Sequence, residues 1–415
     1  MNNSKSIILF LAFLLVFSFS NAQNFNLVKA NTVEYKSSFI DGPKIDTLIK
    51  YKLHEDGIVI HHSDDVLVFL SNIEYPGKEG YCYPAIFRFE KKGSNWEKIY
   101  AHYFYAELTR KCAYGDEDAP EPQAVYEPKT GNIVVFGNRF SLFFEHKTQK
   151  PTYMTGGDYK YTNFYDGVVL CDSLIAIAGE VDYEGGKSKT VVYLYRTGIM
   201  KSKWRSFDMG FDAGCPQLVR ISDNSFYCYN SKSDSLDNNT FKLRKITLDR
   251  KAKEGKGSLI VDWEKELIVK SKKYADDNRW LTDFPKSNTF EMINNKLVIL
   301  YRWPSARYYS IGTYDLNGNL IWDKIIPNDL YDASYDVFID TWDDGTILFG
   351  YEQSYNNYDA TELFSIGLDG EVKNVVQLPH QIENFNLFKG TINDFITYAQ
   401  WEFNLRKFHI TIKQE

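Results

Sequence analysis

Three ionisable side chains are candidates for acid–base chemistry, although they lie far apart in the sequence. Glu180 and Glu352 are each the first polar residue after a short apolar run. Two carboxyl groups held at a defined separation can act as acid and base in glycoside hydrolysis. His102 lies near Tyr103 and Tyr105 and suits a general base of the kind that polysaccharide lyases use. These residues can cooperate only if the fold brings them together.

A second group consists of aromatic and arginine side chains, which suit binding rather than catalysis. Aromatic rings stack on the apolar faces of sugars or on peptide side chains, and an arginine pairs with a carboxylate or a sulfate. The candidate ligand-binding residues are Tyr81, Tyr83, Arg139, Arg302, Trp303, Tyr308, Tyr355 and Trp401. Most of them closely follow an apolar run, so their placement depends on the structure that the runs form.

The apolar runs recur seven times, each directly after a two-residue polar turn. They are Val66 to Leu70, Ile133 to Phe136, Leu174 to Ala178, Ser225 to Tyr229, Leu297 to Tyr301, Thr346 to Phe349, and Phe395 to Tyr398. Nearly every position of a run is apolar, which indicates a strand covered on both faces. The first polar residues after the runs are Ser71, Asn138, Glu180, Asn230, Arg302, Glu352 and Gln400. If the repeats form a ring, these polar residues gather at one rim.

Around each run the same order of strands can be traced. In the third repeat the predicted strands are Asp166 to Leu170, Leu174 to Ala178, Val191 to Tyr195 and Trp204 to Phe207. Turns such as Asn317-Gly318 and Asp369-Gly370 accept the positive φ angles of tight hairpins. Four hairpin-connected strands per repeat predict an all-β fold, a β-propeller of seven four-stranded blades. Six or eight blades also fit the spacing.

The two ends of the chain are predicted to share a blade. After Lys407 to Ile412 the sequence ends without a fourth strand for the last repeat. The segment Thr32 to Tyr51 contains strand-like residues that belong to no complete repeat. Pairing this N-terminal segment with the last blade would close the ring and cover an exposed sheet edge.

The first and third repeats resemble Kelch-type propeller blades. The third repeat has Leu174 to Ala178 followed by Gly179-Glu180, then Val191 to Tyr195, then Trp204. Kelch blades usually carry a Gly-Gly pair where this chain has Gly179-Glu180. The resemblance therefore implies a propeller architecture and transfers no catalytic residue.

The first residues predict export. Residues 1–22 combine Lys5, an apolar stretch from Ile7 to Phe17, and small residues at Ser20-Asn21-Ala22, as in a signal peptide. We expect a mature chain of residues 23–415 that forms a single β-propeller domain. No later segment approaches the roughly 20 apolar residues that a membrane span requires. The expected location is extracytoplasmic, whether periplasmic, cell-surface or secreted.

Charge and cysteine content narrow the set of partners. The formal net charge is −7, whereas nucleic-acid binding requires a basic face. Of the five cysteines, Cys171 and Cys228 lie within or beside apolar runs and are expected to pack as small hydrophobes. Cysteine spacing gives no zinc motif, and the pairing of the others stays open. No metal or cofactor is predicted.

Two functions fit these observations. The first is a secreted or periplasmic β-propeller that binds a glycan or an extracellular protein at an aromatic-rich rim. The alternative is a polysaccharide-processing enzyme, a glycoside hydrolase or lyase, with its site in the central funnel. A converging pair of ionisable side chains would favour the enzyme.

Overall fold

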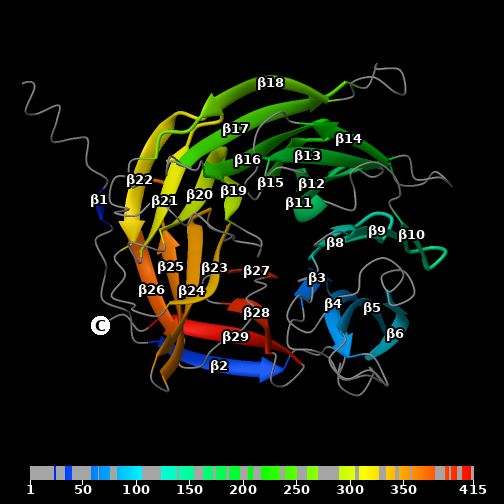
Figure 1. The fold of residues 1–415 in the computed structure, drawn as a ribbon. Coiled ribbons are helices and arrows are strands. Elements are labelled where there is room, and N and C mark those ends of the chain that lie inside the picture. The colour runs from blue at the N-terminus through cyan, green and yellow to red at the C-terminus, as the bar shows by residue number, and fades with distance from the viewer. Residues whose placement is uncertain are drawn as a thin grey trace, which may run out of the picture.

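A computed structural model gives the fold of most strands and their connecting turns (Figure 1). It describes residues 23–24, 33–39, 58–63, 65–74, 82–104, 123–137, 140–153, 162–171, 174–183, 187–196, 204–208, 216–233, 239–249, 259–269, 289–303, 308–326, 333–341, 345–355, 358–378, 388–391, 394–399 and 404–412. Within these ranges the fold is all-β and contains no helix. This part of the chain therefore has no helix long and apolar enough to cross a membrane.

Six sheets contain four antiparallel strands each. The first is β3 (Ile58–His62), β4 (Val66–Glu74), β5 (Cys82–Lys92) and β6 (Asn95–Tyr103). The second is β7 (Gln123–Glu127), β8 (Asn132–Gly137), β9 (Phe140–Glu145) and β10 (Lys150–Tyr153). The third is β11 (Thr162–Cys171), β12 (Leu174–Tyr183), β13 (Lys187–Arg196) and β14 (Trp204–Asp208). The fourth is β15 (Gln217–Ser222), β16 (Ser225–Ser233), β17 (Asn239–Leu248) and β18 (Leu259–Glu266).

The remaining sheets follow the same order with two additions from the N-terminal region. One is β23 (Ala333–Thr341), β24 (Ile347–Tyr355), β25 (Tyr358–Ile366) and β26 (Val372–Leu378). Another is β27 (Phe388–Thr391), β28 (Asp394–Ala399), β29 (Asn404–Ile412) and β2 (Val33–Phe39). A five-stranded sheet contains β19 (Phe290–Ile293), β20 (Lys296–Trp303), β21 (Tyr308–Tyr314), β22 (Leu320–Ile326) and β1 (Gln23–Asn24).

The predicted apolar runs lie in the second strand of a sheet, namely β4, β8, β12, β16, β20, β24 and β28, except that Thr346 directly precedes β24. Every residue of β8 is buried, as expected for a strand covered on both faces. The four strands predicted for the third repeat correspond to β11 to β14. The hairpin glycines Gly318 and Gly370 have φ angles of 72° and 81°, as their turns require. These strand and turn predictions are confirmed.

The first strands of the sheets lie toward the middle of the molecule, and the last strands lie at its periphery (Figure 1). Successive first strands contact one another from β3 through β7, β11, β15 and β19 to β23. The hydrophobic core lies between neighbouring sheets. For example, Phe136 of β8 packs in one cluster with Phe164, Tyr193 and Tyr195 of the next sheet. This arrangement is a β-propeller-like all-β fold.

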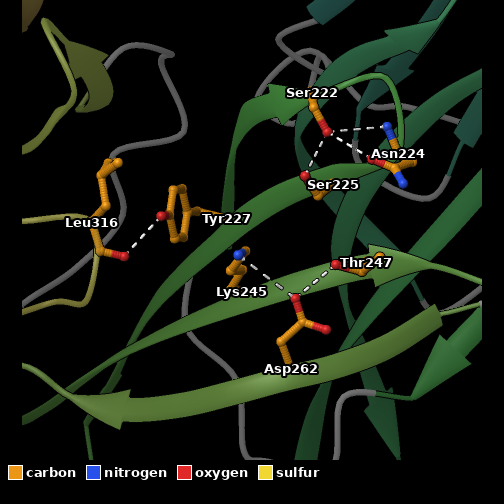
Figure 2. A network of polar contacts seen from close by, with 8 residues as sticks. All are labelled: Ser222, Asn224, Ser225, Tyr227, Lys245, Thr247, Asp262 and Leu316. Carbon is orange, nitrogen blue, oxygen red and sulfur yellow. Dashed lines mark hydrogen bonds and ion pairs between the residues drawn. The ribbon is translucent and has the colours of Figure 1, made fainter.

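Polar contacts tie the fourth sheet to its first turn and to the following sheet (Figure 2). In its first turn, Ser222 Oγ donates to Asn224 Oδ1 at 2.7 Å. Across the outer pair of strands, Thr247 Oγ1 donates to Asp262 Oδ2 at 2.7 Å. The hydroxyl of Tyr227 donates to the Leu316 carbonyl of the following sheet at 2.8 Å. Side-chain hydrogen bonds therefore add to apolar packing in fixing neighbouring sheets.

Two short segments from the N-terminal region join sheets built much later in the chain. Strand β2 pairs antiparallel with β29 from Val33 opposite Ile412 to Phe39 opposite Arg406. This places the N-terminal segment on the last sheet, where the sequence predicted it. Strand β1 pairs parallel with β22 through Gln23 and Asn24, a contact that the sequence did not predict. A two-residue strand carries too little pattern to be recognised before its partner is known.

Candidate functional site

A row of polar side chains crosses the third sheet near the end of its second strand. Asn163 of β11 lies opposite Glu180 of β12, and Glu180 lies opposite Thr190 of β13. Directly opposed residues point to the same face of a sheet, with Cβ atoms about 5 Å apart. Ala178, two residues before Glu180, packs against the fourth sheet. The row therefore faces the fourth sheet.

Asn230 of β16 completes this group from the other side of the interface. Its Nδ2 donates to Oγ1 of Thr190 at 3.2 Å. The side chain is almost fully buried, with 1% of its surface exposed. We call Asn163, Glu180, Thr190 and Asn230 the polar cap, because they cover the apolar interface formed by residues such as Ala178 and Cys228.

The polar cap is rich in hydrogen-bond acceptors. The buried Oδ1 atoms of Asn163 and Asn230 accept no hydrogen bond within the described part of the chain. Oε2 of Glu180 accepts a hydrogen bond from the Tyr165 hydroxyl at 3.4 Å. Buried carbonyl oxygens are nearly always satisfied in folded proteins, so two unsatisfied oxygens in one small group call for a donor.

A β-bulge positions the first-strand residues of this site. The register of β11 against β12 shifts between Phe164 and Asp166, which leaves Tyr165 as the extra residue. Side chains along a strand normally alternate between the two faces of the sheet, and the extra residue shifts this alternation by one position. Asn163 and Asp166 therefore point to the same face although they are three positions apart. Without the bulge, one of these two side chains would face the second sheet instead.

Asp166 forms a polar clamp between the third and fourth sheets. Its Oδ2 accepts a hydrogen bond from the backbone N–H of Leu218 in β15 at 2.6 Å, and its Oδ1 accepts one from Gly167 N–H at 2.7 Å. Burial raises the pKa of the Asp166 carboxyl to about 7, although these two backbone donors lower it. Because both oxygens are engaged by the backbone, the carboxyl serves to hold the two first strands together.

His102 lies on β6, the peripheral strand of the first sheet. Its ring packs edge-on against Phe104, with ring centroids 4.8 Å apart, and lies 5.1 Å from the ring of Phe144. Glu180, by contrast, lies in the polar cap of the third sheet. Described contacts therefore do not join these two acid–base candidates.

The predicted binding residues at the hairpins are placed by their backbone. Arg302 and Trp303 of β20 pair with Tyr309 and Tyr308 of β21, at the end of their hairpin. In the first sheet, Tyr83 lies opposite Ile73. In the sheet of β23 to β26, Tyr355 lies opposite Tyr358. The acid–base candidate Glu352 lies in the same ladder, opposite Thr361. Tyr81, Arg139 and Trp401 lie outside the described residues.

Cys228 behaves as predicted, as a small hydrophobic residue. Its thiol is free, its side chain is fully buried between the third and fourth sheets, and burial raises its pKa to about 12. A thiol with so high a pKa is a poor nucleophile at neutral pH. Over the described ranges, no group of three or more His, Cys, Asp or Glu residues could hold a metal ion.

The polar cap was visible in the sequence only in part. The polar residues that end the apolar runs included Glu180 and Asn230, and the structure joins both through Thr190. Asn163, Tyr165 and Asp166 gave no signal as site residues, because a bulge breaks the alternation that would have placed them.

No family model and no curated protein matches the chain. Among solved structures it is similar to a quinoprotein alcohol dehydrogenase-like protein from Bacteroides thetaiotaomicron, at 11% identity over 79% of this chain and 67% of that one, with a TM-score of 0.46. A structure from a study of two prolyl endopeptidases matches at 11% identity over 85% of this chain, with a TM-score of 0.45, and the chain spans 46% of its length. The soluble aldose sugar dehydrogenase of Escherichia coli matches at 11% identity over 70% and 96% of the two chains, with a TM-score of 0.37. At this identity the likeness concerns the fold alone.

Proposed function

We propose that this protein is an extracytoplasmic, closed seven-bladed β-propeller that binds a glycan or an extracellular protein at an aromatic-rich rim. The pairing of β2 with β29 supports the closed ring, because it supplies a fourth strand for the sheet of β27 to β29. The contacts between successive first strands support a common axis.

Aromatic residues at the hairpin ends carry the binding proposal. Trp303 lies opposite Tyr308 in the last pair of the β20–β21 ladder, and Tyr355 lies opposite Tyr358 in the last pair of the β24–β25 ladder. Both hairpins join the second strand of a sheet to its third. In a ring whose sheets repeat one strand order, such hairpins all lie at the same rim. Aromatic residues at such a rim would offer stacking surfaces for sugars or peptide side chains.

A glycan array and a pull-down of extracellular proteins, both with the chain 23–415, test this proposal. Trp303→Ala and Tyr355→Ala are each expected to weaken binding of the ligand found by up to about tenfold, because they remove a stacking surface. Trp96→Ala is the matched control, since Trp96 lies beside the turn between β5 and β6, at the opposite rim. Equal losses for the control and the rim variants would contradict the rim assignment, and depolymerisation of a polysaccharide would instead indicate the enzyme.

Export is the second part of the proposal. Residues 1–22 have the charge, apolar stretch and small residues of a signal peptide, followed by a single domain of residues 23–415. Expression of the full chain in a bacterial host, followed by N-terminal analysis of the protein recovered outside the cytoplasm, is expected to show a chain that begins at Gln23. Recovery of a chain that retains Met1 and remains in the cytoplasm would refute export.

A further inference from the structure

We propose that the polar cap is a ligand subsite that binds the hydroxyl groups of a sugar residue. This inference rests on the proposed function and deepens it, because it selects a glycan over a protein as the ligand. The polar cap shares no residue with the aromatic positions at the hairpin ends, such as Trp303 and Tyr355. The cap is therefore proposed as a separate subsite.

The unsatisfied oxygens give the reason that a ligand is needed. Asn230 is 1% exposed, its Nδ2 is fixed on Thr190, and its Oδ1 accepts no hydrogen bond from any described residue. The Oδ1 atom of Asn163 is also buried and accepts no hydrogen bond from any described residue, although the residue as a whole is partly exposed. A buried acceptor without a donor costs roughly 1–3 kcal/mol of folding free energy, which a bound donor would recover. Two acceptors therefore stay unpaired among the described residues, at a cost to stability.

The geometry places these acceptors close to one another. Asn163, Glu180 and Thr190 occupy adjacent positions of one cross-strand row, with Cβ atoms about 5 Å apart. Asn230 is hydrogen-bonded to the last member of this row. Carboxamide and carboxylate oxygens spaced along about 10 Å suit a ring that carries several hydroxyl donors.

The charges around the cap disfavour an anionic ligand, because it would meet the carboxylate of Glu180 directly. Lys242 lies opposite Asn230 on the same face of the fourth sheet, but its charge is paired with Glu264 at 3.1 Å. A hydroxyl group avoids repulsion by Glu180 and can donate to Glu180 or to either carboxamide oxygen.

The cap lies at the same end of its sheet as a predicted rim hairpin. Glu180 and Thr190 lie three residue pairs before the end of the β12–β13 ladder, where Tyr183 lies opposite Lys187. This hairpin joins a second strand to a third, like the hairpins that carry Trp303 and Tyr355. A glycan on the aromatic rim could therefore place one sugar in the cap.

Saturation-transfer NMR titrations with the methyl glycosides of glucose, galactose, mannose and N-acetylglucosamine test the inference on the chain 23–415. We expect at least one glycoside to bind the wild type. Asn163→Ala and Asn230→Ala are expected to weaken that binding by about tenfold each, because each removes a buried acceptor. Asn224→Ala is the matched control, since Asn224 belongs to the turn between β15 and β16 and lies outside the cap (Figure 2).

A purely structural cap would give a different pattern. Asn230→Ala would then change the unfolding temperature and leave glycoside binding unaltered, which would overturn the subsite. Binding that is lost in Trp303→Ala but kept in both cap variants would also overturn the subsite, while the proposed function would stand.

Absence of glycoside binding by the wild type would overturn the subsite as well. A protein partner found by the pull-down would then still support the proposed function of the rim. Thr190→Val checks the positioning role of Thr190 and should weaken binding without removing either acceptor.

Discussion

Replacing Asp166 with alanine is expected to lower the free energy of unfolding by about 3 kcal/mol, because two partly buried backbone N–H groups lose their acceptor. Those groups belong to Gly167 in the same strand and to Leu218 in the neighbouring sheet. Urea unfolding monitored by tryptophan fluorescence measures the loss. Asp262→Ala is the control, since its carboxylate bonds Thr247 at the periphery, and a change within about 0.5 kcal/mol is expected for it.

The same carboxyl should make stability depend on pH. Its pKa is about 7 in the folded protein and 3.8 when unperturbed, so the folded state holds the proton more tightly than the unfolded state. The group therefore contributes stability below about pH 4, and this contribution is lost as the pH rises through 7. We expect the difference in unfolding free energy between wild type and Asp166→Asn to fall from pH 4 to pH 7. A difference that is constant over this range would show that Asp166 does not titrate there.

Phe136→Ala is expected to have the largest effect on stability, about 3–5 kcal/mol. Phe136 is 1% exposed and packs with Phe164, Tyr193 and Tyr195 across the junction of the second and third sheets. The truncation would leave a cavity between two sheets whose positions are fixed by their neighbours, so the site has little room to collapse. Urea unfolding of Phe136→Ala and of the conservative variant Phe136→Leu measures this cost. A loss below about 1 kcal/mol for the alanine variant would show that packing between sheets contributes little.

Strand positions could be predicted well from the sequence because the central strands have an unusual pattern. Ile133 to Phe136 is apolar at every position, and the structure buries every residue of β8. Polar turns such as Asp223-Asn224 marked where each second strand begins, and β16 begins at Ser225. These signals are local, so no knowledge of the partner strands was needed.

The polar cap and the Asp166 clamp could not be predicted, because both depend on contacts between distant segments. Asp166 bonds Leu218, which lies in another sheet and 52 positions away. Thr190 and Asn230 meet across the same junction. The bulge at Tyr165 decides which side chains of β11 face that junction, and nothing in the sequence Asn163 to Asp166 marks a bulge. Predicting these contacts would have required the register of the strands and the order of the sheets.

The pairing of β2 with β29 also sets an order for folding. Val33 has to find Ile412, a partner at the far end of the chain, and joining such distant segments is slow because a long loop of chain must first be closed. During synthesis on the ribosome, β2 emerges long before its partner and must wait for nearly all of the other sheets. Refolding should therefore finish with this ladder, and until then both strands offer open edges to chaperones or to other copies of the chain.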